Sequence, residues 1–346
     1  MNRRLIPVPL YPVVQSAFAV AIGLLIGAVL MLVFRFDPVA AYLALFQEAF
    51  GNPLGLMESL ANATPLMASA ITFQVGMRAG VFNIGAEGQA YMGAIGAIVL
   101  GSFFALPLGI HAAVATLFAM LLGAAWALPA ALLKVLRGVH EVISTIMLNF
   151  VSFWLVLFLL RNYLSDPGRA EQALPAQETA RYPVIGETLT AVIFVSIAAC
   201  VIVYVFLWRT GMGYELRLAG DSPEAARYAG ISSSKTIILS FVVGGLAAGL
   251  AGATQVLGRP PSWTVELTLD NLVNVGFSGI GVALIGRNHP IGAILAAIFY
   301  GGLLNGGRFM EYVAKVPSEL VLAVNGLIVA ALSTPQIFAI VRKRRK

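Results

Sequence analysis

Charged residues are scarce in this chain. Only 11% of its 346 residues are Asp, Glu, Lys or Arg, and 59% are hydrophobic, whereas an average soluble protein is about 25% charged and roughly 45–50% apolar. A soluble protein of this composition could not cover its core with polar surface, which excludes a soluble enzyme. Intrinsic disorder is excluded too, because disordered chains combine low hydrophobicity with high net charge. The composition therefore predicts a polytopic membrane protein.

Residues for covalent or metal chemistry are equally few. The single cysteine, Cys200, lies inside an apolar run and has no partner for an intrachain disulfide, so we expect a packed thiol. His111, His140 and His289 are scattered, without cysteines or carboxylates at metal-ligand spacing. The sequence also lacks the G-x-S-x-G and H-E-x-x-H motifs. We therefore expect no metal site and no catalytic residue, and the chain is not predicted to be an enzyme.

A phosphate-binding loop is missing as well. Residues 230–236 read GISSSKT, which resembles such a loop superficially but lacks the second glycine and the correct spacing, and no strand precedes it. We expect no cofactor on this chain.

The net charge of +6 does not indicate nucleic-acid binding. The basic residues cluster in short polar segments between apolar runs, and residues 342–346 read RKRRK. Basic segments beside apolar spans are typical of cytoplasmic anchors that face anionic lipid. We therefore expect membrane lipid, and not nucleic acid, to meet these charges.

Long apolar runs are what the chain has in abundance. A helix needs roughly 20 mostly apolar residues to cross a hydrocarbon core of about 30 Å. Ten segments meet this length and predict an all-α membrane protein: 13–34, 58–77, 81–101, 109–133, 141–160, 188–208, 236–257, 269–286, 290–307 and 318–340. The first is interpreted as a retained span and not as a signal peptide, because no small-residue cleavage signature stands out.

The positions of Lys and Arg predict the orientation of these spans, because basic loops stay in the cytoplasm. With ten spans, both termini and every basic segment are cytoplasmic. These segments hold Arg3 and Arg4, Lys134 and Arg137, residues 209–235, Arg287, and the tail 341–346. The mixed-charge segment 161–187 is then external, as is 37–55, whose apolar residues suggest an interfacial helix.

Two six-residue segments suggest an internal duplication. NIGAEG at 83–88 and NVGFSG at 274–279 both read N-[IV]-G-x-x-G inside apolar spans. Gly- and Asn-rich interruptions at corresponding places in two halves indicate broken helices around a central pathway. We interpret residues 1–346 as one transmembrane domain with weakly related halves at about 13–160 and 188–340.

The polar segment 221–230 predicts a short cytoplasmic helix. Asp221 or Ser222 can cap its start, Pro223 suits its first turn, and Glu224 can close a capping box. Gly230 fits the left-handed position that follows a helix. Ala225, Ala226 and Ala229 share one small, flat face, and Arg227 lies between them in sequence. Such a helix is shaped either to enter a groove on another protein or simply to form an ordinary capped loop.

Several segments resemble those of one family of permeases. The E-A-A sequence at 224–226, followed after three residues by Gly230, resembles the cytoplasmic coupling loop of ABC importer permeases. AGVFNIGAEGQ at 79–89, EVISTIMLN at 141–149 and VALIGRNHP at 282–290 resemble segments of the nucleoside and simple-sugar branch of that superfamily. The loop continues as ISSSK at 231–235, without the longer I-x-L-P ending of some other branches.

This resemblance implies a transmembrane subunit that works with partners in a bacterial plasma membrane. The expected partners are a second permease subunit, identical or related, a cytoplasmic ATPase that holds ATP and magnesium, and an external substrate-binding lipoprotein. Residues 221–230 would transmit force from the ATPase to the spans. The implied substrate is a nucleoside or a related ribose or simple-sugar compound, moved by alternating access.

Polar residues near the first N-[IV]-G-x-x-G segment are the main candidate site. Arg78, Asn83, Glu87 and Gln89 lie within or beside an apolar span, where an ionised carboxylate is costly and needs a partner. Glu87 either lines the substrate pathway or forms a structural ion pair with Arg78. Asn83 and Gln89 suit sugar hydroxyls.

Other intramembrane polar residues carry a weaker signal. Asn149, Asn274 and Ser278 either line a cavity or form hydrogen bonds between helices. Gly245 and Gly249, four residues apart, predict a helix-packing face, and Trp208 an interfacial or lipid-facing anchor.

Other functions remain open from the residues alone. An ion-coupled secondary transporter would use Glu87 or Glu141 as its proton site, and a passive channel would need no ATPase. The same permease branch could also carry a different sugar.

Overall fold

The computed structural model describes residues 11–333 of the chain, so Arg3, Arg4 and the basic tail 341–346 lie outside the described residues. Within the described part are thirteen α-helices, a two-stranded hairpin and one 3₁₀ helix. In chain order they are α1 (Tyr11–Val33), α2 (Pro38–Phe50), α3 (Pro53–Arg78), α4 (Ala86–Phe103), α5 (Ile110–Arg137), α6 (Glu141–Tyr163), β1 (Ser165–Asp166), β2 (Arg169–Ala173), η1 (Glu178–Ala180), α7 (Val192–Arg209), α8 (Gly211–Asp221), α9 (Pro223–Tyr228), α10 (Ser233–Leu257), α11 (Val275–Ile285), α12 (Pro290–Ala314) and α13 (Ser318–Ser333).

Each of the ten predicted spans coincides with a helix, but they differ in length. Five helices in the described residues, α5, α6, α7, α10 and α12, are long and apolar enough to cross a membrane. The predicted span 269–286 is wrong as a full crossing, because α11 has only 11 residues and is about 16 Å long at 1.5 Å per residue. The predicted span 81–101 is a helix only from Ala86 onward. The protein is thus a helical, multi-pass membrane protein.

The chain forms two compact units. In the described part of the chain, one combines residues 11–59 with 302–333, and the other, the central unit, comprises residues 60–301. In the first unit α1 packs closely against α13, since a Cβ on Gly23 would lie 2.6 Å from the Cα of Ile328. The predicted helix within 37–55 is confirmed as α2, whose first turn is capped by Asp37 Oδ1 accepting from Val39 N at 2.8 Å.

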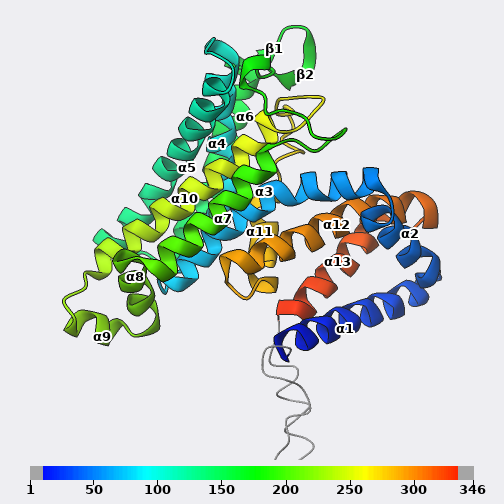
Figure 1. The fold of residues 1–346 in the computed structure, drawn as a ribbon, viewed down its shortest axis with the longest axis horizontal. Helices are drawn as coiled ribbons and strands as arrows, with labels where there is room; N and C mark the ends of the chain where they lie inside the picture. The colour runs from blue at the N-terminus through cyan, green and yellow to red at the C-terminus, as the bar shows by residue number, and fades with distance from the viewer. Residues whose placement is uncertain (1–10, 334–346) are drawn as a thin grey trace, which may run out of the picture. The chain divides into compact units, whose positions relative to one another are not determined.

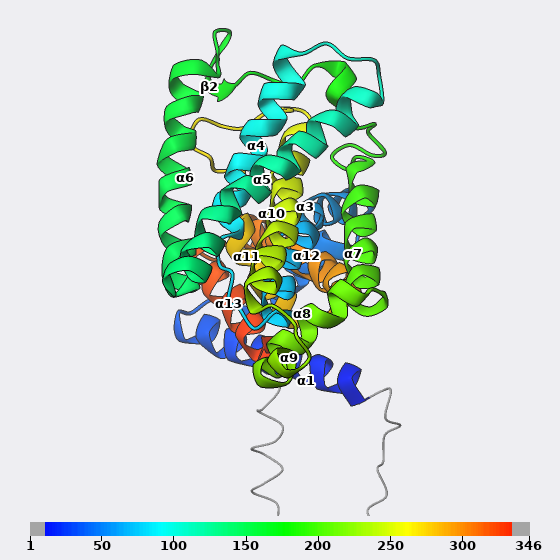
Figure 2. The same ribbon diagram turned by 90° about the vertical axis from the view of Figure 1, so that its left-hand side faces the viewer.

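The core of the central unit is a close assembly of α4, α5 and α10 (Figures 1 and 2). Glycines allow the backbones to touch: a Cβ on Gly249 would lie 2.4 Å from Ala119 O, and one on Gly252 would lie 2.1 Å from Ala90 O. A Cβ on Gly245 would lie 2.6 Å from the Cα of Ala124 of α5. The predicted packing role of Gly245 and Gly249 is confirmed. Small residues serve this purpose in membrane helices because the lipid provides no hydrophobic drive for association.

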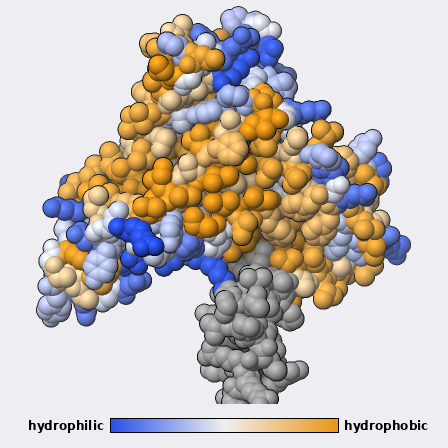
Figure 3. Space-filling model, viewed as in Figure 1, coloured by the Kyte–Doolittle hydropathy of each residue, from blue (hydrophilic) through white to orange (hydrophobic). Residues whose placement is uncertain are grey.

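The outer surface of the central unit is apolar between its two ends. On α6, the exposed residues Ile143, Met147, Phe150, Trp154 and Phe158 follow helical spacing and form a stripe suited to lipid. The space-filling view shows hydrophobic surface over the helices, and hydrophilic residues around the β1–β2 hairpin and near α8 and α9 (Figure 3).

The two ends of the central unit are built differently. At one end, the β1–β2 hairpin and the segment after it are joined to residues 258–274, for example by Ala173 N donating to Val265 O at 2.9 Å. The predicted loop 161–187 therefore contains a short antiparallel hairpin. At the other end lie α8 and α9, as Figures 1 and 2 show.

Candidate functional site

The central feature of the site is the break between α3 and α4. α3 ends at Arg78 and α4 begins at Ala86. Gly80 has a φ of +72°, a conformation that costs glycine little. Asn83 Oδ1 accepts from Gly85 N at 2.9 Å, which holds the turn just before α4. The predicted interruption of this apolar stretch is confirmed, and the non-helical residues 79–85 are called the break segment below.

Glu87 joins the two N-[IV]-G-x-x-G segments. Its side chain is buried and accepts four hydrogen bonds. Tyr91 OH donates to Oε1 at 2.8 Å and Asn274 N at 2.5 Å; Gly276 N and Phe277 N donate to Oε2 at 2.5 and 3.3 Å. Three of these donors are backbone N–H groups at the start of α11, where helical N–H groups have no partner within the helix and attract negative charge. Glu87 therefore ties α4 to α11 inside the central unit.

The predicted ion pair between Arg78 and Glu87 is wrong. The Arg78 guanidinium donates from Nη2 to Asn288 O at 3.1 Å, and its carbon lies 5.2 Å from the centroid of the Trp208 ring. Sequence proximity suggested the pair, but Arg78 is the last residue of α3, whereas Glu87 lies beyond the break. Backbone donors of α11 satisfy the carboxylate in place of an arginine.

Asn149 of α6 holds the other side of the break. Its Oδ1 accepts from Gly88 N, and its Nδ2 donates to Ile84 O, both at 2.9 Å. The side chain is buried. These bonds satisfy backbone groups that the break leaves without helical partners, so in this structure Asn149 makes the interhelical contacts that were one of its two predicted roles.

Asn83 and Gln89 are buried side by side. Asn83 Oδ1 lies 3.5 Å from Gln89 Nε2, while Asn83 Nδ2 and Gln89 Oε1 have no hydrogen-bond partner among the described residues. The pair thus keeps one donor and one acceptor unused. Their predicted role in the substrate pathway stays a prediction.

Asn274 and Ser278 are more accessible. Asn274 is exposed, with a left-handed φ of +68°, and Ser278 is half-buried one turn later. Phe277 between them is 44% exposed. Both residues lie at the end of α11 that Glu87 binds, and their role in the substrate pathway stays a prediction.

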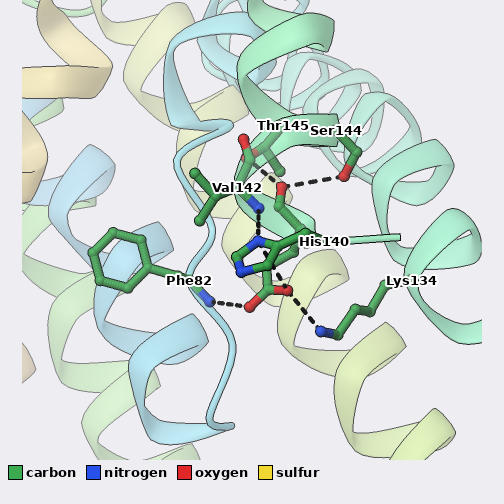
Figure 4. Close-up of polar contacts among 7 residues, drawn as sticks. Phe82, Lys134, His140, Val142, Ser144 and Thr145 are labelled. Atoms are coloured by element: carbon green, nitrogen blue, oxygen red, sulfur yellow. Dashed lines mark hydrogen bonds and ion pairs between the residues drawn. The ribbon is translucent and has the colours of Figure 1, made fainter. Parts of the chain in front are cut away.

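Glu141, which the sequence suggested only as a proton site of a secondary transporter, binds the break segment. Its carboxylate binds both Phe82 of the break segment and Lys134 near the end of α5, two residues that are labelled in Figure 4. Phe82 N donates to Oε1 at 3.1 Å, and Lys134 Nζ lies 2.7 Å from Oε2. The carbonyl of Glu141 accepts from Thr145 Oγ1 at 2.7 Å, which orders the first turn of α6. The one sequence feature that pointed to a partner for Glu141 was Lys134, near the end of the preceding helix.

The predicted helix in 221–230 exists as α9, with different details. Asp221 ends α8, and Ser222 at the N-cap makes no side-chain hydrogen bond, so the predicted cap and capping box are wrong. Ser222 alone separates the two helices, but unlike Thr210 between α7 and α8 it does not accept a hydrogen bond from the helix that follows. Gly230 has the predicted positive φ, at +76°.

The three alanines of α9 do not form one exposed face. Ala226 is fully buried, whereas Ala225 and Ala229 are exposed. Pro223, Glu224, Arg227 and Gly230 are exposed as well, and Tyr228 is 95% exposed. α9 therefore presents a mixed surface of small, charged and aromatic side chains at one end of the central unit.

Comparison with known proteins identifies the family. Residues 55–332 match the family described as branched-chain amino acid transport system, permease component. The guanosine ABC transporter permease protein NupP of Bacillus subtilis is 34% identical, with 90% of each chain covered. The nucleoside ABC transporter permease protein NupB of Lactococcus lactis is 31% identical over 96% of this chain and 94% of its own. The glucose ABC transporter permease protein TsgB13 of Haloferax volcanii is 31% identical over 91% and 86%.

No solved structure matches the chain. The family match covers both interrupted helices, the Glu87 contact and α9. Permease components of this kind move solutes and leave hydrolysis to other subunits, so the chain is a transport subunit and not an enzyme. The chain belongs to the permease components of the branched-chain amino acid transport family.

Proposed function

We propose that this chain is a membrane-spanning subunit of an ATP-driven importer of nucleosides in a bacterial plasma membrane. The observation that carries the proposal is the junction of two interrupted helices, α4 and α11, through Glu87. Helix ends that meet inside a transporter offer polar backbone and side-chain groups to a solute, which continuous helices cannot do. The substrate class comes from the relatives named for guanosine and nucleoside transport.

The start of α11 suits a nucleoside chemically. Asn274 and Ser278 offer an amide and a hydroxyl to ribose hydroxyls, and the exposed ring of Phe277 lies between them in sequence. Aromatic rings can stack on any nucleobase, because every base has a flat π-face. Asn83 and Gln89, with one unused donor and one unused acceptor, would join them if the junction opens during transport.

The two ends of the central unit suit two external partners. The exposed α9, next to the basic segments at its end, would dock a cytoplasmic ATPase that binds ATP and magnesium. The β1–β2 end would receive a substrate-binding lipoprotein. A second permease subunit would complete the path. Both chain ends in the cytoplasm require segment 269–286 to pass the membrane as a loop followed by the short helix α11. The ATPase would favour one of two states by contacting them differently.

Uptake by the reconstituted complex tests the function. Vesicles are prepared with the permease in the membrane, the ATPase on the inner side and the binding lipoprotein outside. They should accumulate radiolabelled guanosine only when ATP is enclosed with the ATPase. Vesicles with an ATPase variant that cannot hydrolyse ATP provide the control. ATP-independent accumulation driven by a proton gradient would instead support the secondary transporter.

Glucose is the second candidate substrate, favoured by the similarity to the Haloferax glucose permease. Competition separates the two: unlabelled nucleosides should suppress guanosine uptake, and glucose should not. Suppression by glucose alone would place the chain with the sugar carriers.

A further inference from the structure

Helix α8 touches the break segment through glycine. A Cβ on Gly220 would lie 2.3 Å from Arg78 O and 2.7 Å from Gly80 N, and one on Gly80 would lie 3.0 Å from the Cα of Gly220. These neighbours are backbone atoms, which cannot swing aside as a side chain can. The last turn of α8 and the break between α3 and α4 are therefore in direct backbone contact.

A ring of Trp208 strengthens the same contact from α7. The guanidinium carbon of Arg78 lies 5.2 Å from the ring centroid and that of Arg217, on α8, lies 5.6 Å from it. Cation–π contacts of this kind favour the observed placement of both arginines. Of the two predicted roles of Trp208, a purely lipid-facing anchor is wrong, because the ring contacts the end of α3 and helix α8; an interfacial position stays a prediction.

The turn between α11 and α12 joins this cluster. His289 lies 4.8 Å from Trp208 between ring centroids, and Asn288 O accepts from Arg78. Gln74 Nε2 of α3 also donates to His289 O at 3.3 Å. Both ends of α11 are thus bound to α3 or α4, by Glu87 at its start and by Arg78 after its end.

On the side away from α8, the break segment is hydrogen-bonded to α6. Phe82 N is held by Glu141, and Ile84 O is held by Asn149. The backbone of the break segment is thus bound to α8 on one side and to α6 at two points on the other. The shortest covalent route from this contact to Glu87 and α11 runs through the break segment into α4.

We infer that Gly220, with Trp208 and its two arginines, is the positioning contact through which α8 and α9 move the α4–α11 junction. This inference rests on the proposed function, since it names the internal route from the docked ATPase to the substrate path. The residues involved touch neither substrate nor nucleotide. They act by keeping α8 and the break segment in register as one body.

A matched pair of glycine substitutions tests the contact. Gly211 lies on the same helix with no atom within 4 Å of an added Cβ. Gly220→Ala should lower ATP-driven guanosine uptake about tenfold or more, a typical size for a lost coupling, while Gly211→Ala should stay within about twofold of the unaltered complex. The ATPase should still copurify with both variants, and its hydrolysis should continue in Gly220→Ala without uptake. Equal uptake by the two variants, or loss of the ATPase from Gly220→Ala alone, would overturn the inference.

A second measurement does not depend on transport. In a Cys200→Ala background, a cysteine introduced as Asn274→Cys reports the start of α11 by its labelling rate with an impermeant maleimide. ATP should change this rate in the assembled complex, and adding Gly220→Ala or Arg217→Met should abolish the change. Arg209→Met, at an exposed position on α7, is the charge-matched control and should keep it. A change that survives Gly220→Ala contradicts the inference, whereas no change in the unaltered complex contradicts the proposed function as well.

Discussion

A carboxylate that is buried in a membrane protein needs hydrogen-bond donors, and most of the donors to Glu87 are backbone N–H groups. Three N–H groups at the start of α11 and the Tyr91 hydroxyl surround it. A helix start can accept a carboxylate because its first N–H groups have no partner within the helix. The consequence is that one side chain decides where α11 begins relative to α4.

Glu87→Gln should destabilise the protein. The amide keeps one oxygen but places an NH₂ group against N–H or O–H donors, and losing acceptors for buried donors costs about 3 kcal/mol. We expect a lower thermal unfolding midpoint in detergent and loss of uptake. Glu187→Gln, at an exposed loop position, is the control and should change neither. A Glu87→Gln midpoint equal to that of the control would show that the side chain does not act as a charged acceptor.

His289 should make stability depend on pH. Partial burial, and then the positive charge of Arg78, lower the pKa of His289 below its ordinary value. The neutral imidazole of His289 is therefore favoured in the folded protein. Because the unfolded chain then binds the proton more readily, stability is present above the ordinary His pKa of about 6.5 and falls as the pH drops below it. The unfolding midpoint should decrease from pH 8 to pH 5.5, and His289→Gln should flatten this decrease.

At the scale of elements, glycine spacing decides how closely helices pack. α10 passes α5 at Gly245 and Gly249 and α4 at Gly252, each with backbone atoms of the neighbouring helix where a Cβ would stand. α11 uses the same device, since a Cβ on Gly276 would meet the backbone of Glu87. α4 and α11 can therefore lie close enough for Glu87 to bind the start of α11 only because residue 276 is a glycine.

Gly252→Ala should cost about 1–3 kcal/mol of stability, as overpacking of a tight core does. The added methyl group would lie against Ala90 O and Ala94 N of α4, and neither backbone atom can move alone. Gly326→Ala is the matched control, because this glycine of α13 has no atom within 4 Å of an added Cβ; there, alanine should be neutral or slightly stabilising. Thermal unfolding of the two purified variants measures the difference. Equal midpoints would contradict close packing between α10 and α4.

At the scale of the whole molecule, the sidedness of the membrane assigns the partners. Three basic segments meet near the break segment: the end of α5 through Lys134 and Glu141, helix α8 through Arg217 and Trp208, and the turn after α11 through Asn288 and Arg78. The β1–β2 hairpin lies at the other end of the central unit (Figure 1). Charge asymmetry predicts that the basic end is cytoplasmic. The proposed ATPase could act on α9 only with this orientation.

Reporter fusions test the orientation. A reporter inserted after Tyr228 should indicate the cytoplasm, and one inserted at Gly168, in the β1–β2 turn, should indicate the external side. Both positions are exposed, so insertion should leave the packed helices intact. An external signal from Tyr228 would reverse the assignment of both partners.

Much of the fold could be predicted because it depends on local composition. Apolar runs placed a helix at each of ten sites, and Asn and Gly marked both interruptions before α4 and α11. α11 was the exception: its apolar stretch has the length of a span, but Asp270, Asn271 and Asn274 precede a helix of only 11 residues. Local hydropathy does not distinguish an apolar loop from an apolar helix, so the sequence did not show that α11 begins only at Val275.

The sequence by itself determined the membrane class, the family and the places where helices break, because composition and short motifs are properties of neighbouring residues. Only the tertiary structure decided that Glu87 binds α11 and not Arg78, that Trp208 lies between two arginines, and that Gly220 rests on the break segment. The groups that meet in these contacts lie about 10 to 190 positions apart in sequence. Which of them meet depends on how closely the helices pack, which no single segment encodes.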